Sequence, residues 1–121
     1  MPSSAPRAKS KSDDPSCEHD AEVQSEFSAL ELDRAASLFR ALGDSERLRL
    51  LEMLAQNERC VSELAGAVDA GLSTVSQRLK VLRAEQLITR RRVGKHIYYS
   101  LADEHIKGLV RNALEHVSHK D

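Results

Sequence analysis

A pair of short helical segments, joined by a short turn, constrains the fold of this chain more than any other feature. Apolar residues recur at helical spacing over residues 61–68 and again from about Ser73 to Ala84. Residues 69–71, which lie between the segments, are Asp, Ala and Gly, and Asp and Gly are common turn formers. The sequence therefore predicts two helices packed across a short turn.

After the second helix, the period of the sequence changes from that of a helix to that of strands. Residues 87–91 and 96–100 are rich in β-branched and aromatic residues and flank a Val-Gly-Lys turn at 93–95. We expect a two-stranded hairpin here. Helix, short turn, helix and hairpin, in this order, make up a winged helix-turn-helix.

The rest of the chain predicts further helices around this unit. Apolar spacing favours helices over about 21–42 and 46–56, and a last helix that begins at Asp103. All three prolines lie within residues 1–16 among many serines, a composition typical of disorder. We expect a disordered tail over 1–20 and one domain over 21–121, mainly α with a small β-hairpin.

Composition limits both the core and the cellular compartment. Aromatic residues make up 3% of the 121 residues, so the core is aliphatic, and so short a chain gains from a core shared with a second copy. The sequence shows neither an apolar run of membrane-spanning length nor a secretory signal. We therefore expect a cytoplasmic protein without a membrane partner, in which Cys17 and Cys60 are free thiols or metal ligands.

Positive charge is concentrated in the hairpin and in the helix predicted over about 73–84, although the formal net charge of the chain is −1. Between positions 78 and 95, seven Lys and Arg residues stand against one acid, Glu85. A local basic patch is the electrostatic footprint of a nucleic-acid-binding surface. The alternative is a solvated charged face.

The helix predicted over about 73–84 has an apolar and a polar side. If Val75, Leu79 and Leu82 face the core, the other side can enter a DNA major groove. Hydroxyls, Gln and Arg suit contacts to bases and phosphates there, and hairpin cations suit phosphates or a minor groove. The candidate DNA-binding residues are Ser73, Thr74, Ser76, Gln77, Arg78 and Lys80 on the helix, and Arg90, Arg91, Arg92 and Lys95 on the hairpin. The predicted partner is double-stranded DNA.

The last helix carries four candidate metal ligands: Asp103, His105, His116 and His119. His105 and His116 share a helix face but lie about 16 Å apart along the axis, at about 1.5 Å per residue. Ligands about 2 Å from one zinc ion lie within about 4 Å of each other. One copy of the helix therefore cannot complete the site.

Two copies of the last helix that cross antiparallel can complete it. Asp103 and His105 of one chain then meet His116 and His119 of the other, and a twofold dimer makes two equivalent sites. Three nitrogens and one carboxylate suit tetrahedral Zn(II), with Co(II) as a mimic. The alternative is an ordinary surface of exposed histidines.

A second candidate metal site involves the tail. Cys17 and His19 lie there. Cys60 directly precedes the helix predicted over residues 61–68, and Glu63 lies one turn further on. Thiolates favour zinc, cadmium or lead. The alternative is a tail cysteine and an ordinary cysteine at a helix start.

Four stretches of the chain, taken together, resemble the ArsR/SmtB family of metalloregulators. Residues 42–51 resemble the family's opening element, and 59–64 its Cys-Val-Cys element. Residues 73–83 are similar to its recognition helix and 92–101 to its wing. The likeness covers about residues 35–119 and implies a homodimer that represses metal efflux or sequestration genes in its apo form.

The resemblance also assigns ligands. Asp103, His105, His116 and His119 match the zinc site on the C-terminal helix of the family's zinc and cobalt sensors. Cys17, His19, Cys60 and Glu63 resemble the N-terminal site of its cyanobacterial zinc sensors. Ser62 replaces the second cysteine of the thiol-rich sensors, which disfavours a dedicated cadmium, lead or arsenic sensor. In the family, the region of Gln86 and Leu87 receives a hydrogen bond from the ligand that corresponds to His116.

Two other classes of protein compete with a zinc-responsive repressor. An enzyme would need an open coordination position, whereas all four candidate ligands come from protein, so we expect neither catalysis nor a small-molecule substrate. The second alternative is a winged-helix regulator of a non-metal signal. Nickel fits if further tail ligands give six-coordination, and cobalt and cadmium remain alternatives to zinc.

Overall fold

The computed structural model describes residues 22–118. The two helices predicted around residues 69–71 are α4 (Val61–Val68) and α5 (Leu72–Ala84). Asp69 ends α4 in the left-handed conformation, with φ of 55°, and Gly71 is the N-cap of α5. The helix-turn-helix is therefore confirmed.

The core lies between α5 and the helices packed against it. Helix α3 (Ser45–Gln56) begins at Asp44, whose carboxylate accepts the N–H of Arg47 at 2.9 Å. Helices α3 and α4 both pack on α5. Within residues 22–118, the large side chains that are fully buried are Leu50, Leu51, Leu64, Val75, Leu79, Leu82, Leu87 and, on the C-terminal helix, Val110. As expected, the apolar side of α5 faces this core.

The sheet has three antiparallel strands, in the order β1-β3-β2, rather than the two that we expected. Strands β2 (Ile88–Val93) and β3 (His96–Leu101) form the predicted hairpin, and Gly94 supplies the positive φ of its turn. Strand β1 (Arg59–Cys60) pairs with Tyr98 and Tyr99 of β3. A two-residue strand has no measurable periodicity, so only its distant partner reveals it.

Helix α2 (Ala29–Leu42) begins later than the predicted start near residue 21. The Ser28 hydroxyl accepts the N–H of Glu31, and the Glu31 carboxylate accepts the N–H of Ser28. This reciprocal capping box fixes the start of the helix. The Ser-x-x-Glu pattern was present in the sequence and could have located it.

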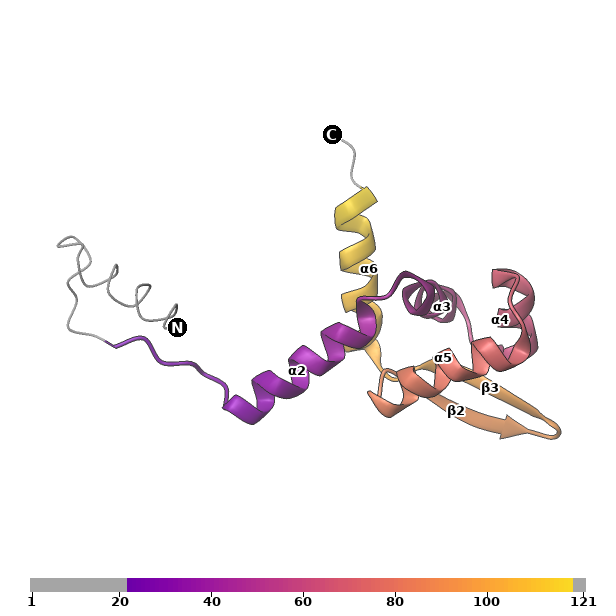
Figure 1. Ribbon diagram of the computed structural model, residues 1–121, viewed down its shortest axis with the longest axis horizontal. Coiled ribbons are helices and arrows are strands. Elements are labelled where there is room, and N and C mark those ends of the chain that lie inside the picture. Colours follow the sequence, from indigo (N-terminus) through magenta and orange to yellow (C-terminus); the bar gives the residue numbers. More distant parts are fainter. Residues whose placement is uncertain (1–21, 119–121) are drawn as a thin grey trace, which may run out of the picture.

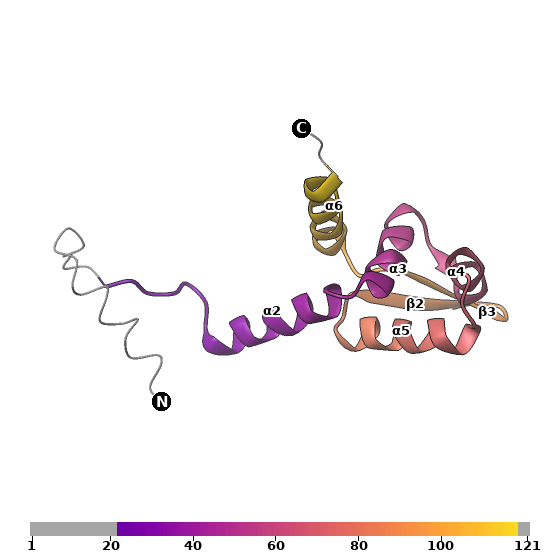
Figure 2. The ribbon, with the colours of Figure 1, turned by 45° about the horizontal axis from the view of Figure 1, so that its top comes forward.

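Helices α2 and α6 (Glu104–Ser118) project from a body made of α3, α4, α5 and the sheet (Figures 1 and 2). Among the described residues, α2 buries only Ala41, and α6 buries Ile106 and Val110. Large apolar side chains elsewhere on both helices are exposed, as Leu30 (64%) and Val117 (75%) illustrate. None of the described helices combines the length and apolarity of a membrane span.

Candidate DNA interface and metal-ligand residues

The outer face of α5 is polar and exposed, in line with its predicted role. Ser73, Thr74, Ser76, Gln77 and Lys80 are all exposed. The first turn of α5 contains no acidic residue, and its N-cap is a glycine. The N-terminal N–H groups of this helix, with their partial positive charge, are thus suited to a phosphate.

Arg78 differs from the other candidates on α5. Its side chain is only 25% exposed, and Nη1 lies 3.7 Å from Glu46 Oε1 on α3. The guanidinium therefore lies beside the acid of a neighbouring helix. A contact between Arg78 and DNA would compete with this ion pair.

The arginines of the hairpin lie on two faces of the sheet. Arg90 is paired in register with Tyr99 and Arg92 with Ile97, whereas Arg91 is paired with Tyr98. Because side chains alternate along a strand, Arg90 and Arg92 share the face of the buried Tyr99, and Arg91 lies on the other. Lys95, in the hairpin turn, is exposed.

Arg91 is held by an acid that sequence reasoning missed. Its Nε and Nη2 donate to Glu58 Oε2 and Oε1 at 2.7 and 2.8 Å, a bidentate pair. The hydrogen bond from Arg91 lowers the pKa of Glu58, and the same contact raises the pKa of Arg91. The two residues are 33 positions apart, so no local pattern links them.

At the start of α6, two of the four candidate metal ligands lie together. His105 Nδ1 is 3.8 Å from Asp103 Oδ1, with side chains 98% and 55% exposed. Asp103 Oδ1 also accepts the N–H of Ile106, which fixes the carboxylate at the start of the helix. This separation is within the roughly 4 Å that one zinc ion allows between two ligands.

His116 is exposed on the last turn of α6, about 16 Å along the axis from His105 at about 1.5 Å per residue. The described part of the chain contains no group of three or more ligating side chains that could hold an ion. His119 lies outside the described residues. Within the described residues, the candidate ligands of one chain are thus divided between the two ends of α6.

Of the second candidate site, only Cys60 and Glu63 lie within the described residues, while Cys17 and His19 lie outside them. Cys60 is half-buried, and its N–H donates to Glu63 Oε1 at 3.0 Å. Cys60 Sγ lies 3.3 Å from Ser62 Oγ. These contacts cap the start of α4, so Glu63 has a structural role whether or not it binds metal.

Comparison with known proteins identifies the family to which this chain is similar. The model of the family described as "Bacterial regulatory protein, arsR family" matches residues 44–90. A Synechocystis protein named transcriptional repressor SmtB homolog is 43% identical over 101 residues, 83% of this chain and 76% of the relative. A Staphylococcus aureus homolog of the cadmium resistance regulatory protein CadC is 37% identical over 82 residues, 67% of this chain and 68% of the relative.

Solved structures show the same fold. The homodimeric winged helix-turn-helix DNA-binding domain of a Mycobacterium bovis protein, described as a possible ArsR-family transcriptional regulator, aligns with a TM-score of 0.70. The two are 36% identical, over 83% of this chain and 96% of that one. This chain therefore belongs to the ArsR/SmtB family of winged helix-turn-helix transcriptional repressors.

Proposed function

We propose that this protein is a metal-responsive repressor that binds operator DNA as an apo homodimer and is released when Zn(II) binds between the C-terminal helices. The observation that carries the metal assignment is the 3.8 Å approach of His105 Nδ1 to Asp103 Oδ1. It presents two zinc ligands at one end of α6, with a third, His116, exposed near the other end.

The DNA-binding part of the proposal rests on the body of the chain. Helix α5 offers an outer face of hydroxyl, amide and ammonium groups to the major groove, and the hairpin carries cations beside it. Because Arg91 is paired with Glu58, we assign phosphate contacts on the wing to Arg90, Arg92 and Lys95.

The dimer part of the proposal rests on the two projecting helices. A helix in a protein gains most of its stability from packing of its apolar face, whereas an isolated helix is only marginally stable. Phe27 and Phe39 of the α2 region, and Val117 of α6, are more than half exposed in a single chain. A second copy that covers them would bury this apolar surface. The solved Mycobacterium bovis domain is described as homodimeric.

The donor set fits zinc. In a twofold dimer, Asp103 and His105 would hold the ion together with the partner subunit's His116 and His119, and give three nitrogens and one oxygen. A bound zinc ion supplies a fixed positive centre that joins the two subunits. Cys17, His19, Cys60 and Glu63 remain a second candidate site, and cobalt, nickel, cadmium or lead remain alternative ions.

Release follows from linkage between the two ligands. Two recognition helices must lie about 34 Å apart to enter successive major grooves. If the zinc-bound dimer favours another separation, zinc weakens DNA binding, and DNA weakens zinc binding by the same factor. The names of the relatives, an SmtB homolog and a cadmium resistance regulator, support metal as the signal.

The test is a titration of a labelled operator duplex with the protein, by fluorescence anisotropy, at fixed salt and with either chelator or zinc. The duplex is first selected from a randomised pool with the apo protein. We expect zinc to weaken binding of the unsubstituted protein by a factor of about 5 to 150. His116→Ala should bind the duplex normally without zinc and should not be released by it.

Asn112→Ala is the matched control, since Asn112 is an exposed residue of the same helix that cannot serve as one of the four ligands. It should respond to zinc as the unsubstituted protein does. Normal release of the His116→Ala variant would refute the regulatory site. A protein that ignores all of these ions but releases DNA with another signal would favour the non-metal alternative.

A further inference from the structure

The turn that follows the recognition helix has a fixed and costly backbone shape. Gln86 has a positive φ of 61°, a conformation that residues with a side chain rarely adopt. The N–H of Gln86 donates to the carbonyl of Arg83 at 2.9 Å, and the N–H of Leu87 to that of Leu82 at 3.0 Å. This pattern is a Schellman motif, and the full burial of Leu87 anchors it. The end of α5 is therefore held in one position relative to the core.

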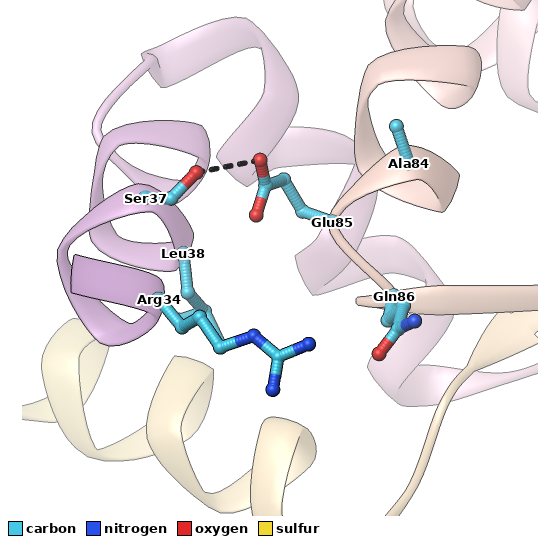
Figure 3. Close-up of a pocket in the computed structure, with 6 residues that line it drawn as sticks. All are labelled: Arg34, Ser37, Leu38, Ala84, Glu85 and Gln86. Carbon is cyan, nitrogen blue, oxygen red and sulfur yellow. Dashed lines mark hydrogen bonds between the residues drawn. The ribbon is translucent and has the colours of Figure 1, made fainter. Parts of the chain in front are cut away.

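Both projecting helices are attached at this turn. The carbonyl of Leu87 accepts the N–H of Ala102 at 3.0 Å, directly before Asp103 and α6. On the other side, the Ser37 hydroxyl of α2 donates to Oε2 of Glu85, the C-cap of α5, at 2.7 Å (Figure 3). Movement of either helix would thus reach the same end of α5.

The Ser37–Glu85 bond spans a surface cavity of about 340 Å³ between α2 and the end of α5. Figure 3 shows Ser37 and Arg34 on the α2 side, and Glu85 and Gln86 on the other. Among the described residues, it is the one side-chain hydrogen bond that joins α2 to α5 or its C-cap. A short bond from a hydroxyl to a carboxylate is among the stronger kinds of hydrogen bond. An open cavity offers little packing that could replace it.

We propose that Ser37 and Glu85 are positioning residues whose hydrogen bond sets α5 relative to α2 and so fixes the half-site spacing that the dimer accepts. The inference rests on the proposed dimeric DNA binding, in which α2 packs against the second copy. The two recognition helices then read DNA at a separation set by the path from one α5 through both α2 helices. Without the bond, α5 can shift relative to α2, and duplexes of altered spacing become better tolerated.

The test measures affinity for a series of duplexes. The duplex selected with the apo protein is lengthened or shortened by one and two base pairs at its centre, and binding is measured by anisotropy with chelator present. The unsubstituted protein should discriminate sharply between spacings. Ser37→Ala should reduce that discrimination about fivefold, the size expected for the loss of one net hydrogen bond. Glu85→Ala should do the same, and the double variant should add nothing further.

Two conservative variants keep the bond and should keep the spacing profile: Ser37→Thr retains the hydroxyl, and Glu85→Gln retains a carbonyl acceptor. Asp33→Ala, an exposed residue on the same helix, is the matched control. If Ser37→Ala weakens all duplexes by one factor, the bond is merely structural and the inference is wrong. Failure of the unsubstituted protein to bind two half-sites as a dimer would instead refute the proposed function itself, and the inference with it.

Discussion

The body of the molecule and its two projecting helices differ in how much of their packing one chain supplies. In the body, Leu64, Val75 and Leu79 are at most 1% exposed, and the face proposed to bind DNA is complete. On the projecting helices, side chains such as Leu30 and Val117 remain exposed, and the candidate metal ligands lie in separate parts. One chain can thus form a complete candidate DNA-binding face, whereas the proposed operator spacing and the proposed metal sites both need two chains.

The largest effect should come from the core of the body. Leu79→Ala removes a side chain that is 1% exposed and should lower the free energy of unfolding by about 2–5 kcal/mol, because a cavity is left behind. The measurement is urea denaturation followed by circular dichroism. Leu30→Ala on α2 is the paired control, and in dilute protein it should cost much less. Equal losses would contradict the idea that α2 packs mainly against a second copy.

The next largest effect tests whether the metal site is shared. His105→Ala and His116→Ala each remove one ligand from both sites of a twofold dimer. Mixed subunits of the two variants, allowed to exchange, should regain one intact site in each heterodimer. Co(II) absorption should then recover to about a quarter of the unsubstituted level when subunits pair at random. No recovery on mixing, with exchange verified, would place all ligands of each site in one chain.

A smaller effect separates the two faces of the wing. Arg90→Ala should weaken DNA binding and reduce the slope of log affinity against log salt by about 0.9, the value for one lost phosphate contact. Arg91→Ala should leave that slope unchanged, because its guanidinium is paired with Glu58. The salt dependence of anisotropy titrations measures both. A loss of slope for Arg91→Ala as large as that for Arg90→Ala would show that DNA displaces Glu58.

The smallest effect is a pH dependence of stability from the same ion pair. Arg91 lowers the pKa of Glu58 in the folded chain, so the pair stabilises the protein above the ordinary glutamate pKa. This contribution is lost as the pH falls through the lowered folded value. The difference in melting temperature between Glu58→Gln and the unsubstituted protein should thus be present at neutral pH and shrink in acid, below about pH 4. A difference that does not change with pH would exclude this linkage.

Sequence periodicity was enough for the helices of the body, because α3, α4 and α5 each bury the apolar residues of one side. Val75, Leu79 and Leu82 recur at helical spacing on α5 and are all buried there. The start of α2 was predicted too early because apolar spacing was followed past Ser28, although the capping pattern marked the true start. Strand β1 escaped prediction because two residues have no period.

The candidate sites also combine features that local sequence predicts with contacts that only the folded chain shows. Which face of α5 is polar follows from its buried stripe, and the pairing of Asp103 with His105 follows from their closeness at a helix start. The pairing of Arg91 with Glu58, and that of Ser37 with Glu85, cannot be predicted from a helical stripe or from closeness in the sequence. These partners are 33 and 48 positions apart, and only the folded chain brings them together.

Local sequence was enough to predict the helix-turn-helix, the hairpin and the spacing of the candidate ligands on the last helix, because these depend on periodicity and on the fixed rise of a helix. The folded structure was needed to show that Arg91 of the wing is paired with Glu58 and that Ser37 joins α2 to the end of α5. Such contacts depend on where distant segments meet, and packing of the whole chain sets that position.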